Sequence, residues 1–222
     1  MLSADAIVKL QDETTTKWHD LEPPGVDLLH ADAWLDRVAR QHRANFDLWH
    51  IEDEARTPGA GDARLADVKR RIDRTNQLRN DLAEELDRTL LDWLAPQRLP
   101  YEEAPLHSES PGLIIDRLSI LALRIYHTRE EAERRDAPDQ HAARNRERLA
   151  ILEEQRADLA RCLDALWRET LGGTRRFKLY RQLKMYNDPS LNPAIYRNSR
   201  LDSGTDAVSA AGPPVAPIDV QG

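Results

Sequence analysis

Cysteine, glycine and aromatic residues are all scarce in this chain of 222 residues, and each scarcity argues against a class of protein. The single cysteine, Cys162, cannot form an internal disulfide, so we expect a reducing, cytoplasmic setting. Only 9 glycines and 5% aromatic residues, against 32% charged residues, favour long solvated helices over a sheet.

Long hydrophobic runs are also missing. No stretch of about 18 uninterrupted apolar residues is present, so we expect no membrane span. The first residues, MLSADAIVKLQDE, lack a cationic stretch followed by an apolar one, and no signal peptide is predicted. A net charge of −7 argues against nucleic acid as a partner.

Motifs that would name a reaction are absent as well. The sequence contains no GxSxG of a serine hydrolase, no phosphate-binding GKS/T loop and no GxGxxG of a dinucleotide site. Cys162 has no CxxC partner for a zinc site. The sequence therefore assigns no substrate and no cofactor, and leaves open whether the protein is an enzyme.

What the chain does have is helical periodicity, with no segment that alternates as a strand would. The predicted fold class is all-α: a single domain, residues 1–198, of about five long antiparallel helices plus a short basic C-terminal helix. A Ser/Gly/Pro/Ala-rich tail, residues 199–222, is predicted to be disordered. The predicted helices span about residues 3–19, 33–56, 62–94, 111–127, 139–171 and 174–187.

Capping residues support these boundaries. Asp62 is predicted to cap the third helix, Ser110 with Pro111 to begin the fourth, and Gly172 with Gly173 to end the fifth. The third helix has a predicted packing face of Leu65, Val68, Ile72, Ala83, Leu86, Leu90 and Trp93.

The packing face of the second helix carries unexpected polarity. With Trp49 at the centre of that face, His42, Asn45, Asp53 and Arg56 all lie within about 60° of it. Other helices repeat the pattern, and we call the whole set the polar seam; its further members are Asn76, Arg79, Asp116, Arg117, Arg124, His127, Asn145 and Arg156.

Burying an unpaired charge costs several kcal/mol, so the seam must pair internally or meet a ligand or water. Two interpretations stay open: a structural network of ion pairs, or a polar pocket between helices. Because arginines outnumber acids on these faces, such a pocket would prefer an anion.

A basic segment, Thr174–Tyr186, holds five cationic side chains and no acid. Lys178 and Arg181 in it could face a bound phosphate, for which arginine forks are suited. Alternatively, the segment covers an acidic surface of the protein or of a partner.

Four inward residues are candidates for chemistry. His42 or His127, with Asp53 or Asp116 as partner, would make the acid–base pair if there is catalysis. The same four residues could hold a metal. No repeated Glu-x-x-His spacing supports that alternative, so no metal ligand is assigned.

Four blocks in order carry a family resemblance: NFDLWHIEDEAR, KRRIDRTNQLRNDLAEELD, GLIIDRLSILALRIYH and RFKLYRQLKMYNDPSLNP. Together they resemble the bacterial family filed as domain of unknown function 4254, over roughly Ala4 to Pro193. The resemblance implies no activity and no catalytic residue. Members of that family are often encoded near glycosyltransferases of surface-polysaccharide pathways, which implies a sugar-phosphate or nucleotide-sugar context.

Three hypotheses follow. In the first, a cytoplasmic helical protein of glycan biosynthesis binds a phosphorylated sugar or nucleotide sugar. The predicted ligand-binding residues are Asn45, Trp49, Arg56, Asn76, Arg79, Arg117, Arg124, Lys178 and Arg181. In the second, an interaction protein docks an acidic partner such as a glycosyltransferase, and in the third the chain is a metal-dependent helical-bundle enzyme.

Arg79 separates these ideas, because it lies mid-helix near the centre of an apolar face and cannot reach solvent. It needs an anionic partner, either Asp53 or Asp116 or a bound phosphate. The excess of basic groups favours the phosphate. In that case Arg79→Met would not destabilise the ligand-free protein, whereas losing a protein partner would cost roughly 3–5 kcal/mol.

Overall fold

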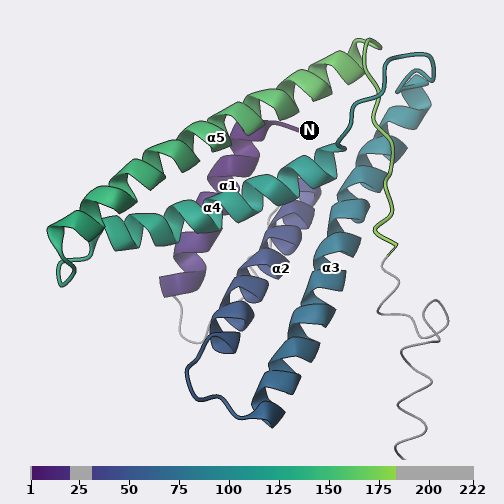
Figure 1. Ribbon diagram of the computed structural model, residues 1–222. Coiled ribbons are helices and arrows are strands. Elements are labelled where there is room, and N and C mark those ends of the chain that lie inside the picture. The colour runs from purple at the N-terminus through teal and green to yellow at the C-terminus, as the bar shows by residue number, and fades with distance from the viewer. Residues whose placement is uncertain (1, 21–31, 184–222) are drawn as a thin grey trace, which may run out of the picture. The chain divides into compact units, whose positions relative to one another are not determined.

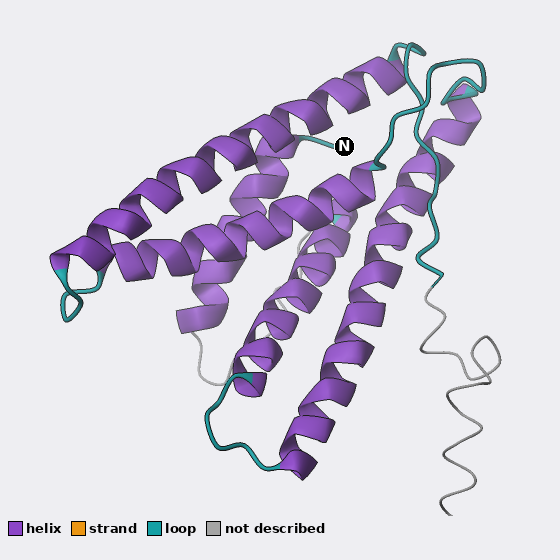
Figure 2. Ribbon diagram, viewed as in Figure 1, coloured by secondary structure: helices purple, strands orange, loops and turns teal. Residues whose placement is uncertain are grey.

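The computed structural model describes residues 2–20 and 32–183, which are helices joined by loops (Figure 2). This confirms the predicted all-α class, since within those residues the only β-pairing is one isolated bridge. The elements are α1 (Ala4–Asp20), α2 (Ala33–Ala55), α3 (Asp62–Leu94), the 3-10 helix η1 (Ala95–Gln97), α4 (Pro111–Glu133) and α5 (Asp139–Leu171).

The helices belong to one compact unit, Met1–Gln182. The second unit, Leu183–Gly222, has only its first residue described, so the predicted tail at 199–222 lies outside the described residues. None of the helices that the structure describes is long and apolar enough to cross a membrane.

Two helical hairpins organise the first unit (Figure 1). In each hairpin, α2 with α3 and α4 with α5, the helices run antiparallel as predicted. The hairpins cross each other: α4 runs across α2 at a steep angle, and its N-terminal end meets α3 (Figure 1). Helix α1 packs against α2, α4 and α5, and thereby joins the two hairpins.

The helix ends follow the sequence closely. Asp32 caps α2 by accepting hydrogen bonds from the backbone N–H of Trp34 and Leu35. Pro111 is the first residue of α4 and Gly172 is the C-cap of α5, as predicted. The prediction for α3 was wrong by one residue, since Gly61 is the N-cap and Asp62 is the first helical residue.

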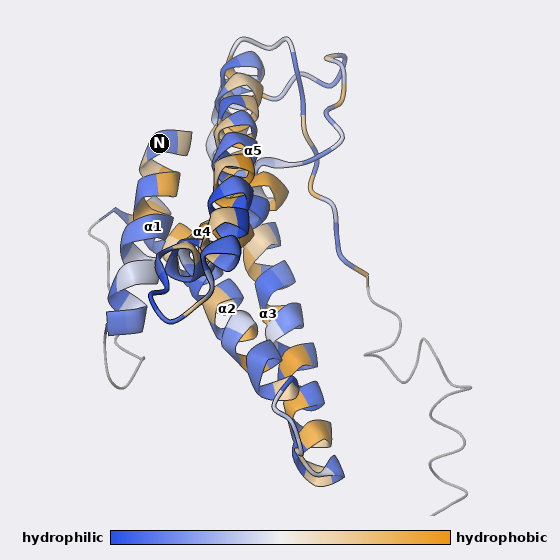
Figure 3. Ribbon diagram, turned by 60° about the vertical axis from the view of Figure 1, so that its left-hand side comes forward, coloured by the Kyte–Doolittle hydropathy of each residue, from blue (hydrophilic) through white to orange (hydrophobic). Residues whose placement is uncertain are grey.

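The main core forms where α1, α3 and α5 meet α4. Ile114, Ile115 and Leu118 of α4 are almost fully buried there, in one cluster with apolar side chains from α1, α2, α3 and α5. Burying such a side chain contributes about 1.5–3 kcal/mol. Orange and blue stretches alternate along the helices in Figure 3, which is the amphipathic pattern that this packing requires.

Two residues predicted for the packing face of α3 are exposed. Leu65 is 47% exposed in the first turns of α3, the end of the α2–α3 hairpin that α4 does not cover. Trp93 is 40% exposed, and its ring lies beside that of Trp167 at the surface.

The predicted short basic helix is not formed in the described part of its range. Residues 175–183 are extended, and Arg176 pairs with the loop before α4: the Arg176 N–H donates to Pro105, and the His107 N–H donates to the Arg176 carbonyl. Phe177 is buried at 1% exposure. The backbone groups that a helix would use internally are thus engaged with the loop.

Candidate metal centre

The polar seam does not converge on one cavity, and its inner part is a closed hydrogen-bond network around Asp116. This carboxylate is 6% exposed and accepts hydrogen bonds from Gln41 Nε2 (2.6 Å) and Asn45 Nδ2 (2.9 Å). It also accepts two from Arg79, at 2.8 Å from Nε and 2.6 Å from Nη2. Four donors from two helices therefore satisfy it.

Arg79 has its anionic partner inside the protein. Its bidentate pair with Asp116 raises the pKa of the guanidinium, chiefly through the hydrogen bond, and its Nη1 also approaches Asn76 Oδ1 at 3.5 Å. The interpretation that Arg79 awaits a bound phosphate is corrected by this geometry, because Asp116 already occupies the guanidinium fork.

His42 belongs to the same network and is fully buried. Thr15 Oγ1 donates to the Gln11 carbonyl, so it must accept from His42 Nε2 at 2.9 Å, which leaves His42 Nδ1 to accept from Ser119 Oγ at 2.7 Å. Burial lowers the pKa of His42 to about 3. A neutral ring with both nitrogens engaged has no access to a substrate, which corrects its assignment to an acid–base pair.

The remaining candidates lie at the surface. Asp53 and Arg56 are exposed and pair with each other, and Arg117 pairs with Glu109. Lys178 and Arg181 are exposed in the extended segment after α5. Asp53 is therefore not in contact with Asp116 or His42, so the proposed set of these two acids with His42 and His127 does not assemble.

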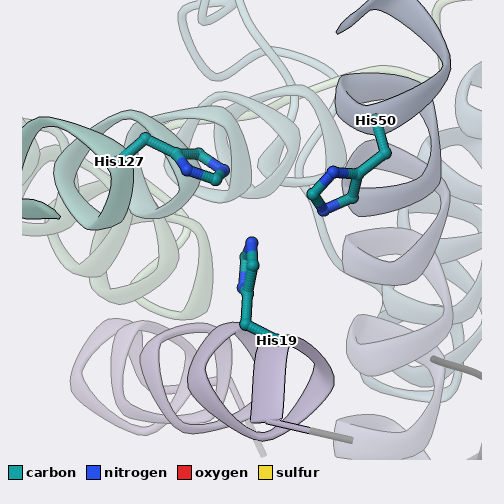
Figure 4. A group of neighbouring side chains, drawn as sticks. All are labelled: His19, His50 and His127. Atoms are coloured by element: carbon teal, nitrogen blue, oxygen red, sulfur yellow. The ribbon is translucent and has the colours of Figure 1, made fainter. Parts of the chain in front are cut away.

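A different cluster does assemble, from three of the seven histidines. His19 of α1, His50 of α2 and His127 of α4 point toward one another, as Figure 4 shows. One ring nitrogen from each lies within 4.8 Å of the others. Within residues 2–20 and 32–183, no Asp, Glu or Cys joins them.

Hydrogen bonds on the outer side of two rings fix which nitrogen faces inward. His19 Nδ1 lies 2.7 Å from the Thr15 carbonyl and His127 Nδ1 lies 2.8 Å from Glu130 Oε2. A carbonyl and a carboxylate only accept, so each Nδ1 atom carries a proton, and in a neutral ring Nε2 then carries the lone pair that a metal ion needs. Both Nε2 atoms are buried and have no hydrogen-bond partner.

Aromatic rings hold the cluster. Trp49 stacks on His127 with ring centroids 4.8 Å apart and planes 9° apart, and Tyr126 stacks on His19 at 4.2 Å and 15°. Phe46 meets His19 and His50 edge-on. These contacts restrict the orientation of the three imidazole rings.

The surroundings of His19 and His50 favour the neutral form of these two rings. Burial lowers the pKa of His19, and burial together with the neighbouring His19 and His127 lowers the pKa of His50. Neutral imidazoles are the form that binds metals. Two inward lone pairs without a donor call for a cation between them.

Two grooves run along α4 and α5 outside this centre. One, of about 780 Å³, is lined by Arg117, Arg124 and Cys162 among others. The other, of about 570 Å³, has Trp49 and His127 among its lining residues. Arg124 and Gln155 line both grooves.

Comparison with known families assigns the chain to one family. The sequence model of one family, described as "Protein of unknown function (DUF4254)", matches residues 35–179. The chain belongs to this family. This confirms the resemblance seen in the sequence, over a shorter range than Ala4 to Pro193. No curated protein and no solved structure gives a significant match.

The DUF4254 segment includes His50 and His127, whereas His19 precedes it. Sequence reasoning found His127 but missed the other two histidines. His50 lies about 100° around α2 from Trp49, so it falls off the face taken as the packing face. Only the crossing of α1, α2 and α4 brings the three together, and no single-helix pattern contains that information.

Proposed function

We propose that this DUF4254 protein binds one transition-metal ion through Nε2 of His19, Nε2 of His127 and a ring nitrogen of His50. The observation that carries the proposal is the pair of buried, unpartnered Nε2 atoms aimed at one point beside a third imidazole. A metal ion there would satisfy both lone pairs at once.

The surroundings of the histidines match those of metal ligands in proteins. Ligating histidines nearly always donate their second ring N–H to a carboxylate or a backbone carbonyl, which orients the ring. Glu130 and the Thr15 carbonyl fill these two roles here.

The ligand set favours a zinc-type ion. Imidazole nitrogens suit zinc, copper, nickel and iron, whereas magnesium and calcium prefer carboxylate oxygens. Tetrahedral zinc with nitrogens at about 2.0 Å places them about 3.3 Å apart. From separations of up to 4.8 Å, the rings need to move inward by about an ångström.

Three histidines leave one position of a tetrahedral ion for water or substrate, which is the arrangement of catalytic zinc sites. Zinc lowers the pKa of a bound water to about 7 and so supplies hydroxide at neutral pH. We therefore propose a metal-dependent hydrolytic enzyme. This is the third hypothesis from the sequence, with His19 and His50 as ligands in place of Asp53, Asp116 and His42.

The first hypothesis, binding of a phosphorylated sugar or nucleotide sugar in glycan biosynthesis, stays a proposal supported only by arginines near His127. The second, docking of a glycosyltransferase, rests on the exposed Lys178 and Arg181. Neither accounts for the histidine cluster.

Calorimetric titration of metal-stripped protein with zinc tests the proposal. One equivalent should bind, and His50→Ala or His127→Ala should weaken that binding at least about a hundredfold. His141→Ala, which removes a histidine outside the cluster, is the control and should leave binding unchanged. Equal zinc affinities in all three variants would contradict the proposal, because the ion would then bind elsewhere.

A further inference from the structure

The groove of about 570 Å³ beside His127 has the chemistry of a binding site of its own. It lies between α4 and α5, and side chains from both helices and from α2 line it. Its volume falls in the range of pockets that take small metabolites.

The groove carries uncompensated positive charge. Arg124 of α4 and Arg148 of α5 both line it, and neither forms an ion pair with any residue that the structure describes. The acid of the groove, Glu131, is held by Arg134 and His141. Two free guanidinium groups therefore face the groove without a local counter-charge.

Two guanidinium groups, one from α4 and one from α5, suit a phosphate better than a carboxylate. A carboxylate offers two oxygens and one charge, whereas a terminal phosphate offers three oxygens and nearly two charges. A phosphate can thus accept hydrogen bonds from both arginines at once.

The rest of the lining suits a hydroxylated body attached to that phosphate. The side chains of Thr128 and Gln155 line the groove and have no hydrogen-bond partner among residues 2–20 and 32–183. Trp49 and Ile151 add an aromatic and an aliphatic wall. Such a mixture of free polar groups and apolar walls is typical of small-molecule sites.

We infer that this groove binds a small phosphate monoester with a hydroxyl-bearing body, such as a sugar phosphate, with the phosphate between Arg124 and Arg148. Trp49 and His127 belong to the same groove, so the bound molecule lies against a ligand of the proposed metal. A role of this molecule as the substrate of a metal-dependent reaction rests on the proposed function, whereas its binding in the groove does not.

Calorimetry on metal-stripped protein in the presence of a chelator tests the binding. The probes are glucose 1-phosphate, inorganic phosphate and glucose. Glucose 1-phosphate should bind most tightly and glucose not measurably. Arg124→Gln and Arg148→Gln should each weaken binding of glucose 1-phosphate about tenfold. The matched control, Arg146→Gln, changes an exposed arginine of α5 outside the groove and should have no effect.

Three results would overturn the inference: no binding of glucose 1-phosphate, equal affinities in all three arginine variants, or glucose binding as tightly as its phosphate. If inorganic phosphate binds as tightly as glucose 1-phosphate, the groove does not recognise a hydroxyl-bearing body, and that part of the inference fails. The two proposals fail separately. If zinc binds at the histidines but Arg124→Gln leaves binding of glucose 1-phosphate unchanged, only the inference about the groove fails. If glucose 1-phosphate binds in the groove but zinc does not bind, only the proposed metal site fails.

Discussion

At the scale of single residues, buried polar groups in this protein divide into those that are satisfied and those that are not. Asp116 and His42 have every inward hydrogen-bonding atom engaged, and they hold α1, α2, α3 and α4 in register. His19 and His127 are equally enclosed at Nε2 but have no partner there. What sets them apart from other unpartnered buried atoms is that they face one another beside a third imidazole, which is the arrangement expected where a cation binds.

Arg79→Met should destabilise the metal-free protein by about 3 kcal/mol. The substitution leaves the buried Asp116 carboxylate without its cation, although Gln41 and Asn45 still donate to it. Urea denaturation measures the change in unfolding free energy. The double variant Arg79→Met/Asp116→Asn should recover part of the loss, and a single variant as stable as wild type would contradict the pairing.

Asp87→Asn should remove a pH dependence of stability. Burial raises the pKa of Asp87 from 3.8 to about 6, even though its Oδ1 accepts from the Gly112 N–H. The folded protein therefore binds more protons than the unfolded chain between those two values, so stability falls as the pH rises from about 4 to about 6.

The size of this effect is about 2 kcal/mol between pH 4 and pH 7. Denaturation of wild type and Asp87→Asn at several pH values isolates it, because other groups titrate equally in both. A constant difference between the two proteins would show that Asp87 titrates normally.

Glu130→Gln should weaken zinc binding about 10- to 100-fold without changing the number of ions bound. The amide accepts the His127 Nδ1–H less strongly than the carboxylate, which lowers the basicity of the inward nitrogen. The control is Glu133→Gln, an exposed acid of the last turn of α4, with the same change in charge. Equal affinities of the two variants would mean that Glu130 does not support the centre.

At the scale of helices, the sequence predicted the elements well and their crossing poorly. Caps and periodicity located four of the five long helices to within about one residue, because those signals are local. The fourth was predicted to end at about residue 127, whereas α4 continues to Glu133. The path after Gly173 was mispredicted, because pairing of Arg176 with the 105–107 loop is a long-range interaction. The histidine cluster was missed for the same reason.

Gly112 shows how tightly the hairpins cross. A Cβ at this position would lie 2.3 Å from the Ala83 carbonyl oxygen and 2.9 Å from the Asp87 side chain. Gly112→Ala should therefore cost at least about 2 kcal/mol, since the backbone of α3 or α4 must shift. Gly61→Ala is the matched control, as a Cβ there meets nothing within 4 Å. Thermal unfolding that is equal in both variants would contradict this close packing.

At the scale of the molecule, the proposed centre takes its ligands from α1, α2 and α4, so both hairpins and the helix that joins them contribute. A metal bound there couples three elements that otherwise meet through the core. The groove along α4 and α5 is built by the second hairpin and reaches the centre at His127. The fold thus brings a cationic groove to the edge of the proposed metal site.

The most direct test of the metal centre is X-ray absorption spectroscopy at the zinc edge on protein loaded with one equivalent of zinc. The account predicts a first shell with three imidazole nitrogens at about 2.0 Å and one further light-atom ligand. A sulfur at about 2.3 Å, which would implicate Cys162, or fewer than two imidazoles, would contradict the proposed centre.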